Sequence, residues 1–305
     1  MPDSTSHLAP RVWFITGCSS GFGKSFVSSI LARGDRVIAT ARKIDGLSEF
    51  ADRDNVKLLE LDITHSQNCL NECILKAINF FGQIDVLINN AGYVLTGPME
   101  EISRISQSQL LDQFNANVFG PLNLTRAVLP HMRERRSGTI IFMSSIAAWR
   151  GVSVGGPYSA SKFALEGSVE SLQKEIASFG INVHLAVLGQ FRTDILAAHR
   201  RQSGRGTNSI RDYDDAVEIF QNRLEETNKK QPGDPLQAVE RILDVVHRRG
   251  YFADHMDIPL RIVLGSDAVD IVRDECQKML DDLERQEQLA RSTDYPGPAE
   301  LQKYQ

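Results

Sequence analysis

Short apolar runs alternate with longer amphipathic segments over the first 190 residues of the chain. The apolar runs lie at 11–16, 36–41, 56–61, 84–89, 138–144 and 181–188, and they are rich in β-branched residues. Several are nearly continuous, as is typical of parallel strands that are covered on both faces. The pattern therefore predicts six buried, parallel strands.

The segments between these runs have the length and the boundary residues of helices. They cover 23–34, 66–82, 106–135 and 157–179; Ser66 is placed to begin a helix, and Gly34 and Gly82 are placed to end one. Strands that alternate with helices in this way form βαβ units. With a seventh strand expected within 259–268, the sequence predicts an α/β fold: one domain over 10–265, built on a doubly wound, seven-stranded parallel sheet of the Rossmann type.

The pattern changes after residue 194. Residues 194–232 are polar and contain glycine, and we expect them to form a loop or lid over the substrate. A helix follows within 232–250. Residues 266–305 are expected to be a helix and a loosely held tail, with the helix packing on the same domain. Its apolar side chains would be those of Val269, Val272, Met279 and Leu283, which have helical spacing.

Composition narrows the kind of protein. The net charge is −5 with a pI near 5.8, which argues against nucleic acid and anionic membranes as partners. No apolar run approaches the ~20 residues needed to span a bilayer, and the N-terminus lacks the apolar region of a secretory signal. The four cysteines form no C-x-x-C pair, and we expect neither disulfides nor a metal site. These features predict a cytoplasmic protein with a small-molecule ligand.

A glycine-rich turn follows the first strand directly. The sequence TGCSSGFG places Gly17, Gly21 and Gly23 between that strand and the next helix. Glycines there permit a tight turn and close approach to a pyrophosphate, while the N–H groups at the start of the helix face the negative charge. This context predicts a dinucleotide site.

The end of the second strand indicates which dinucleotide is bound. A site for NAD usually carries an acidic residue there, but this strand ends in Ala41, followed by Arg42 and Lys43. An arginine can bind a 2′-phosphate and stack on adenine. We therefore expect NADP(H) rather than NAD(H), with Asp62 after the third strand at the edge of the adenine.

Four polar residues have the spacing of a catalytic group. Tyr158 and Lys162 lie four residues apart and share one face of the predicted helix. Ser145 ends the fifth strand, and Asn117 lies within the preceding long helix. A tyrosine that acts as acid and base near pH 7 needs its pKa lowered by ~3, which a nearby ammonium and an oxidised nicotinamide both favour. Ser145 is placed to bind the oxygen of a carbonyl group.

These motifs together resemble the short-chain dehydrogenase/reductase family. The matching pieces are TGCSSGFG, LDIT, NNAG at 89–92, Asn117 in NVFG, Ser145 and YSASK, in the family's order over about residues 10–195. Further phrases, among them ATARK and PLRIVLGSDA, are similar to the 17β-hydroxysteroid-dehydrogenase-like NADP(H) subgroup. The resemblance implies that Tyr158 is the acid/base and that Lys162 lowers its pKa and binds the nicotinamide ribose.

The resemblance also implies roles for the remaining site residues. Ser145 would orient the carbonyl, and Asn117 would hold a water that relays protons toward Lys162. The cofactor-binding set would be Gly17, Ser19, Ser20, Gly21, Phe22, Gly23, Arg42, Lys43, Asp62, Ile63, Asn90, Ala91, Gly92, Tyr158, Lys162, Gly189, Phe191 and Thr193.

One position departs from the family. The sixth strand runs into HLAVLGQFRTD, where Leu188 stands in place of the usual proline while Gly189 and Thr193 keep theirs. Leucine restores an N–H and removes the fixed φ of proline. We therefore expect a looser loop beside the nicotinamide.

Three functions remain compatible with these residues. The leading one is an NADP(H)-dependent enzyme that interconverts a ketone or aldehyde and an alcohol, in the direction of a carbonyl reductase. The second is a reductase-fold enzyme of a biosynthetic pathway that catalyses cyclisation, epimerisation or dehydration. The third is a non-catalytic protein that senses the dinucleotide, although a sensor has no need of Tyr158. The family commonly forms dimers or tetramers through its two long helices, so a homodimer or homotetramer is expected.

Overall fold

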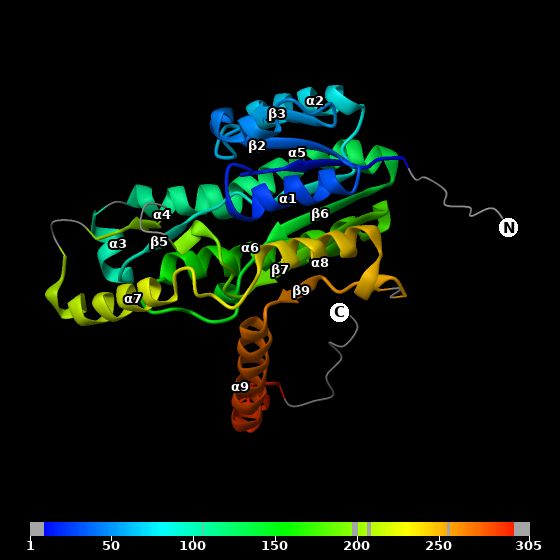
Figure 1. Ribbon diagram of the computed structural model, residues 1–305. Helices are drawn as coiled ribbons and strands as arrows, with labels where there is room; N and C mark the ends of the chain where they lie inside the picture. The colour runs from blue at the N-terminus through cyan, green and yellow to red at the C-terminus, as the bar shows by residue number, and fades with distance from the viewer. Residues whose placement is uncertain (1–8, 106, 197–200, 206–208, 255–256, 296–305) are drawn as a thin grey trace.

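A seven-stranded, fully parallel sheet forms the centre of the protein (Figure 1). The computed structural model describes residues 9–105, 107–196, 201–205, 209–254 and 257–295. The strand order is β3-β2-β1-β4-β6-β7-β9, which confirms the doubly wound fold. The strands are β1 (Val12–Ile15), β2 (Arg36–Ala41), β3 (Val56–Glu60), β4 (Val86–Asn89), β6 (Gly138–Met143), β7 (Ile181–Leu188) and β9 (Arg261–Leu264).

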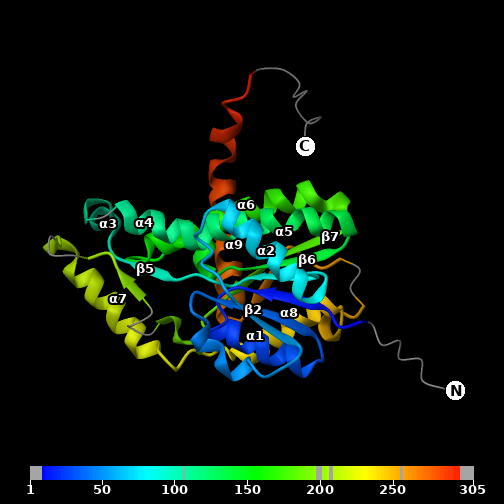
Figure 2. The same cartoon turned by 90° about the horizontal axis from the view of Figure 1, so that it is seen from above.

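Helices cover both faces of this sheet (Figures 1 and 2). One face packs against α1 (Gly21–Ala32) and α8 (Pro235–His247), and the other against α2 (Gln67–Phe81), α5 (Gly120–Arg135) and α6 (Gly156–Ile176). The central strand β1 shows why its sequence is apolar throughout. Val12 and Phe14 belong to the core on the α2, α5 and α6 side, whereas Trp13 and Ile15 belong to the core on the α1 and α8 side.

The order of the strands reverses between β1 and β4. β1 pairs with β2 on one side and with β4 on the other, so the connections leaving these two neighbours run in opposite directions. In open α/β sheets a crevice forms at such a switch point, outside the carboxyl ends of the strands. The glycine-rich turn after β1 and the NNAG segment after β4 therefore meet there.

A smaller layer lies beyond this edge of the sheet. β5 (Val94–Thr96) and β8 (Arg201–Ser203) form a two-stranded parallel sheet beside α3 (Met99–Ile105), α4 (Gln107–Phe114) and α7 (Asp214–Thr227). The segment 194–232, expected to be a loop or lid, therefore contains a strand and a helix in its described part. The long helix expected over 106–135 is also interrupted, because residues 115–119 form a π-helical turn between α4 and α5.

The last helix, α9 (Ser266–Arg291), departs from our prediction (Figures 1 and 2). Its start packs on the domain, where Ala268 is buried and Val272 contacts the core. The remainder projects away from the body and leaves Met279 and Leu283 exposed. The prediction that these two residues pack on the main body is wrong, because the helix axis leaves the surface after its first turns. None of the described helices is both long and apolar enough to cross a membrane.

Candidate active site

The turn after β1 is shaped to receive a phosphate group. Gly17 and Gly21 have φ values of 72° and 54°, a region that side chains other than glycine rarely adopt. A Cβ on Gly23 would lie 2.2 Å from the carbonyl oxygen of Gly17. Ser20 precedes α1 without a side-chain cap, and the first turn of α1 has no acidic residue. The N–H groups at the start of α1 are therefore left for an anion, and the residues present fit a dinucleotide pyrophosphate.

The segment after β4 braces this turn. The backbone N–H groups of Asn90 and Ala91 both donate to Thr16 Oγ1 at 2.9 Å, and Asn90 Nδ2 donates to the carbonyl oxygen of Thr16 at 2.8 Å. A Cβ on Gly92 would lie 2.9 Å from Asn117 Oδ1. The NNAG motif thus fixes the two strand ends against each other and needs glycine at its last position.

The end of β2 provides the surface where the adenosine half is expected. Ala41 ends the strand without a carboxylate, and Arg42 and Lys43 are exposed. Asp62 Oδ1 accepts from both the N–H and the hydroxyl of Thr64, at 2.9 and 2.7 Å. Burial opposes ionisation of Asp62, but these hydrogen bonds and the charges of His65 and Arg42 hold its pKa below the usual range.

On the adenosine side, Ser19 is exposed and approaches Gly46, and Ile63 is buried. These positions agree with an open site for the cofactor beside the turn, at the same edge of the sheet.

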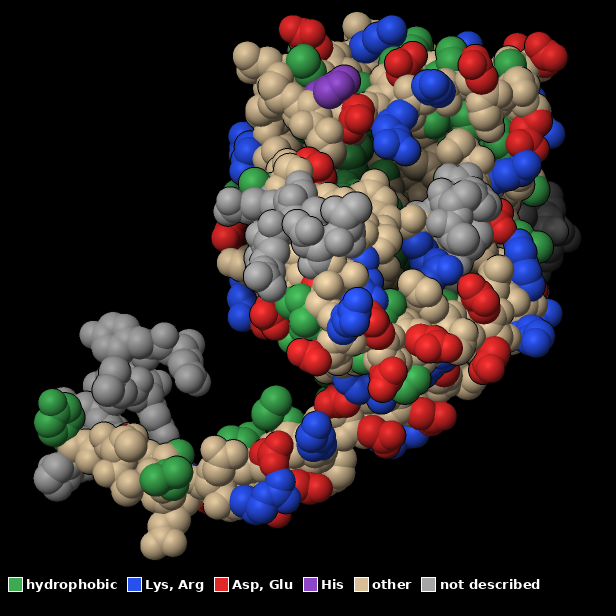
Figure 3. Space-filling model, turned by 90° about the vertical axis from the view of Figure 1, so that its left-hand side faces the viewer, with side chains coloured by type: hydrophobic (Ala, Val, Ile, Leu, Met, Phe, Trp, Pro, Cys, Tyr) green, Lys and Arg blue, Asp and Glu red, His purple; other side chains and the backbone are tan. Residues whose placement is uncertain are grey.

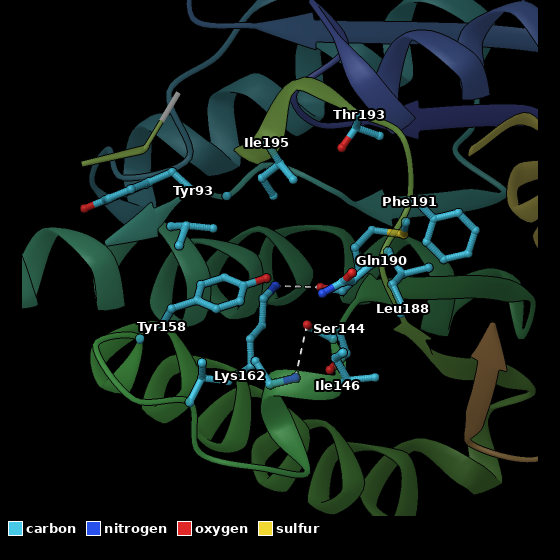
Figure 4. A pocket seen from close by; sticks show the side chains of 18 of the residues that line it. Tyr93, Ser144, Ile146, Tyr158, Lys162, Leu188, Gln190, Phe191, Thr193 and Ile195 are labelled. Carbon is cyan, nitrogen blue, oxygen red and sulfur yellow. Dashed lines mark hydrogen bonds between the residues drawn. The ribbon is translucent and has the colours of Figure 1, made fainter. Parts of the chain in front are cut away.

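A cavity of about 240 Å³ opens beside the turn (Figure 4). It brings together nine of the predicted site residues, which are Phe22, Asn90, Gly92, Ser145, Tyr158, Lys162, Gly189, Phe191 and Thr193. The remaining cofactor residues form the glycine-rich turn and the adenosine side. Asn117 does not line the cavity.

Tyr158 is partly buried in this cavity and shares a hydrogen bond with Ser145. Ser145 Oγ also accepts from the N–H of Ala147 at 3.1 Å, which fixes the hydroxyl at the end of β6. Burial raises the pKa of Tyr158 to about 12, and the bond with Ser145 only partly opposes this. The low pKa expected from the sequence is therefore not a property of the chain alone.

Lys162 lies one helical turn after Tyr158, and its Nζ is 5.7 Å from the centre of the tyrosine ring. Nζ donates to the carbonyl oxygen of Met143 at 2.7 Å (Figure 4). Burial lowers the pKa of Lys162 to about 8, and the charge of Glu166 acts in the opposite direction. The lysine is thus held on the same side as the phenol.

Glu166 is a buried residue of this site that the sequence analysis missed. One turn beyond Lys162, it accepts from Ser144 Oγ at 2.6 Å and from Arg261 Nε at 2.8 Å. Its position four residues after the lysine was the available signal, because an acidic residue on the buried face of a helix requires a partner. The carboxylate places a negative charge behind Lys162.

Both ends of the Asn117 amide form hydrogen bonds within the protein. Oδ1 accepts from the N–H of Tyr93 at 3.1 Å, and Nδ2 donates to the carbonyl oxygen of Tyr93 at 3.0 Å and to Ser161 Oγ at 3.1 Å. These bonds place the π-helical turn next to α6 and to the segment that follows Gly92. The side chain of Asn117 therefore acts as a positioning group, and its part in a proton relay stays a prediction.

The loop after β7 is held by hydrogen bonds to β9 and to the first turn of α9. Leu188 pairs in register with Leu264, and the N–H of Gly189 donates to the carbonyl oxygen of Leu264 at 2.9 Å. The N–H of Gln190 donates to Asp267 Oδ2 at 2.7 Å, while a Cβ on Gly189 would lie 2.1 Å from Asp267 Oδ1. Asp267, in the first turn of α9, therefore anchors the loop, and a looser loop than one with proline stays a prediction.

Aromatic stacking and backbone bonds place the rest of this loop. The rings of Phe191 and Phe22 meet edge to face at 5.4 Å. Thr193 lies beside Gly21, since a Cβ placed on Gly21 would be 3.7 Å from Thr193 Cβ. The N–H of Arg192 donates to the carbonyl oxygen of Gly233 at 3.0 Å. The loop therefore closes over the glycine-rich turn from the side of the cavity.

Comparison with known proteins identifies the family. Residues 11–204 match the short chain dehydrogenase family, and the protein belongs to it. Oxidoreductase BOA17 of Botryotinia fuckeliana is 32% identical over 263 residues, covering 85% of this chain and 90% of its own length. The 3-ketodihydrosphingosine reductase of Bacteroides thetaiotaomicron is 37% identical over 209 residues, covering 68% and 74%.

Solved structures agree with this assignment. A short-chain dehydrogenase from Streptomyces avermitilis has a TM-score of 0.82 at 34% identity and covers 94% of this chain and 99% of its own. ElxO with NADP bound is 23% identical, a level at which only the fold is comparable. It covers 84% of this chain and 96% of its own, with a TM-score of 0.63. A protein from Burkholderia phymatum in complex with NAD covers 87% and 92% at 0.71. The protein is therefore an oxidoreductase of a fold that binds NAD(P)(H).

Proposed function

We propose that this protein is an NADP(H)-dependent carbonyl reductase, which interconverts a ketone or aldehyde and the corresponding alcohol by hydride transfer. The observation that carries the proposal is that Ser145, Tyr158 and Lys162 line one cavity together with Phe22 of the glycine-rich turn and Gly92 of the NNAG segment. A proton donor and the end of a dinucleotide site thus face the same space, as hydride transfer to a carbonyl requires.

The proposed chemistry assigns one task to each side chain. The bound cofactor supplies the hydride, and its organic chemistry is its own. Ser145 Oγ orients the carbonyl oxygen, and Tyr158 Oη donates the proton that this oxygen needs as the alcohol forms. In the reverse direction the phenolate of Tyr158 accepts the proton. Lys162 stabilises that phenolate and would hold the nicotinamide ribose, while Phe191 and Thr193 would hold the carboxamide.

The preference for NADP(H) rests on the end of β2. Ala41 offers no carboxylate to the adenosine ribose, while the exposed Arg42 offers a planar, charged group. The charge of Arg42 contributes to lowering the pKa of Asp62, so the arginine lies on the adenosine side. A 2′-phosphate there would gain a charge-assisted contact, whereas an acidic residue would repel it. The resemblance to the 17β-hydroxysteroid-dehydrogenase-like subgroup supports the same cofactor.

Turnover with a panel of ketones tests the reaction. Mixing the protein with NADPH and each ketone should decrease the absorbance of NADPH at 340 nm. Tyr158→Phe should abolish this decrease while NADPH binding, measured by fluorescence titration, is retained. Binding without turnover on every carbonyl, or a Tyr158→Phe variant with full activity, would contradict the proposal.

A second variant tests the choice of cofactor. Arg42→Ala should weaken NADPH binding by about tenfold or more, because a contact between a charged group and a phosphate contributes about 1.5 kcal/mol or more. NADH binding should change little. An equal loss for both cofactors would overturn the assignment of Arg42.

A further inference from the structure

The wall of the cavity beyond the predicted cofactor and catalytic residues is largely apolar, and Arg201 and Gln231 are among its polar side chains. Val94, Ile146, Val152, Phe220 and Leu224 line it, together with the polar side chains of Arg201 and Gln231. The two polar residues come from separate elements, since Arg201 begins β8 and Gln231 lies between α7 and α8. Polar groups on an otherwise apolar wall are the usual determinants of ligand specificity.

Arg201 contrasts with Arg205, which follows the same short strand. Arg205 donates to both oxygens of the buried Glu101, at 2.8 and 2.9 Å, and to Asp214 Oδ1 at 2.8 Å. Arg201 has no ion pair within the described residues, and its Nε is buried without a hydrogen-bond partner. A guanidinium in an apolar wall without a counter-charge carries a desolvation cost that an anionic ligand offsets.

Gln231 shows that the same cavity is built for a polar ligand. Gln231 is 1% exposed, and among the described residues neither its Oε1 nor its Nε2 has a hydrogen-bond partner. Its backbone is fixed, because Arg192 Nε donates to its carbonyl oxygen at 2.6 Å. A buried amide without partners lowers the stability of the fold. A ligand that hydrogen-bonds to both its oxygen and its nitrogen would restore that stability.

We propose that Arg201 binds an anionic group, a carboxylate or a phosphate, on the carbonyl substrate, and that the amide of Gln231 binds a second polar atom. This inference rests on the proposed function. The phosphates of the cofactor have their own site at the start of α1 and at Arg42, whereas Arg201 pairs with Val94 in the smaller sheet. The substrate class is therefore a partly apolar ketone or aldehyde that carries an acid.

Matched substrates and matched variants test this proposal. A series of keto acids of increasing chain length is compared with the corresponding methyl esters and with keto phosphates, using kcat/KM with NADPH. Arg201→Met should reduce kcat/KM for the preferred anion by about 30-fold or more and leave the methyl ester within twofold. Arg53→Met, which removes an exposed arginine from the turn before β3, makes the same change of net charge away from the cavity and should leave both unchanged.

The outcomes separate this proposal from the proposed function. Efficient reduction of neutral ketones, with no preference for acids and no effect of Arg201→Met, would overturn the anion site and leave the reductase intact. Absence of turnover on every carbonyl would overturn both. A preference for keto phosphates over keto acids, lost in Arg201→Met, would support the site with a phosphate as its ligand.

An independent observation concerns the exposed part of α9 (Figure 3). Met279, Leu280 and Leu283 are 63%, 54% and 58% exposed. Val269, Val272, Cys276, Met279 and Leu283 follow one another at alternating spacings of three and four residues, which is the pattern of a coiled-coil seam. A projecting helix with an apolar seam gains stability by packing against another helix.

The charges along α9 favour an antiparallel pair made with a second copy of the chain. In that arrangement Leu283 would face Met279 of the second copy, Leu280 would face its own counterpart, and Arg273 would meet Glu287. A parallel pair would instead bring Asp282 against Glu287 of the other helix, and like charges at these flanking positions are unfavourable. Asp282 is paired with Arg285 on its own helix, which limits its repulsion from a second Asp282. Arg273 and Glu287 would exchange their exposed intrahelical partners, Asp270 and Arg291, for each other.

We propose that two copies of this chain associate through an antiparallel pairing of α9. Met279→Glu combined with Leu283→Glu should halve the mass of the assembly in analytical ultracentrifugation. Leu75→Glu, at an equally exposed leucine of α2, should not change it. In a Cys276→Ser background, Leu280→Cys should cross-link two copies on mild oxidation.

Two results would overturn this pairing. An unchanged mass of the double variant would show that α9 does not hold the assembly. Efficient cross-linking through the native Cys276 would indicate a parallel pair, in which the two cysteines face each other, and would exclude the proposed orientation.

Discussion

Replacing Lys162 with methionine removes a cation that lies beside Tyr158 while keeping an unbranched apolar side chain. The ammonium stabilises the phenolate form of the tyrosine, so it lowers the pKa of the phenol, and its loss raises that pKa. Nζ lies 5.7 Å from the centre of the ring. At an effective dielectric constant of about 20, two unit charges at this separation attract each other by about 3 kcal/mol, which corresponds to a pKa change of about 2.

Without a cofactor, the pKa of Tyr158 lies far above 7. The positive charges beside the phenol therefore decide whether the phenolate forms near pH 7. Burial raises the pKa of Tyr158 to about 12. This value holds with Lys162 in place, and burial lowers the pKa of Lys162 itself to about 8, so the lysine is only partly charged near that pH. The positive charge of an oxidised nicotinamide, when bound, would lower the pKa of the phenol further.

Alcohol oxidation in the presence of NADP⁺ is the assay, because it requires the phenolate. The rising limb of kcat/KM against pH should move upward by about 2 pH units in Lys162→Met, so the rate at pH 7 falls about 100-fold and recovers at high pH. Lys162→Arg should keep the limb in place. Lys174→Met, at an exposed lysine of the same helix, is the matched control and should change nothing.

A uniform loss of activity at every pH would refute this reasoning. Lys162 would then act through its bond to the carbonyl oxygen of Met143 and through packing, and not through its charge. Circular dichroism at each pH distinguishes either result from unfolding.

Four other substitutions have expected outcomes. Gly23→Ala puts a Cβ 2.2 Å from a backbone oxygen of the glycine-rich turn and should abolish NADPH binding in titration calorimetry. Its control is Gly167→Ala in α6, where the new Cβ meets no described atom within 4 Å. This control should raise the free energy of unfolding by about 0.5–1 kcal/mol. Gln231→Leu removes an unpartnered buried amide, so it should raise the unfolding free energy by about 1–2 kcal/mol in urea titration and increase KM; a lower stability would contradict the unpartnered state of that amide. Asp35→Asn gives up the carboxylate that accepts from Trp13 Nε1 at 2.9 Å, and it should lower stability by about 1–3 kcal/mol at pH 7. This difference should shrink as the pH falls through the pKa of Asp35, which its hydrogen-bond partners hold below the usual range against the effect of burial.

The sequence predicted the parts of the fold that depend on local pattern. Continuous apolar runs identified all seven strands of the main sheet, because a parallel strand buried on both faces has little room for polar residues. The glycine-rich turn and the spacing of Tyr158 and Lys162 were readable for a similar reason. Each motif meets its requirement within a few residues of the chain.

Features that depend on distant contacts were not readable. Asp267 fixes the loop after β7 from the first turn of α9, some 77 positions from the residue it binds. The π-helical turn at Asn117 is stabilised by Tyr93 and Ser161, from two other elements. The apolar seam of α9 is the same for a helix that packs on its own domain as for one that projects from it, so periodicity could not distinguish the two.

Transfer of deuterium from the cofactor to the substrate tests whether the protein catalyses hydride transfer to a carbonyl group. The protein is incubated with NADPH deuterated at both C4 positions of the nicotinamide and with the ketone that is reduced fastest, and the alcohol is analysed by mass spectrometry and NMR. We expect one deuterium per molecule of alcohol, bound to the carbinol carbon, and no labelled product from Tyr158→Phe. Alcohol formed without deuterium, or NADPH bound with no alcohol formed from any ketone, would contradict this expectation.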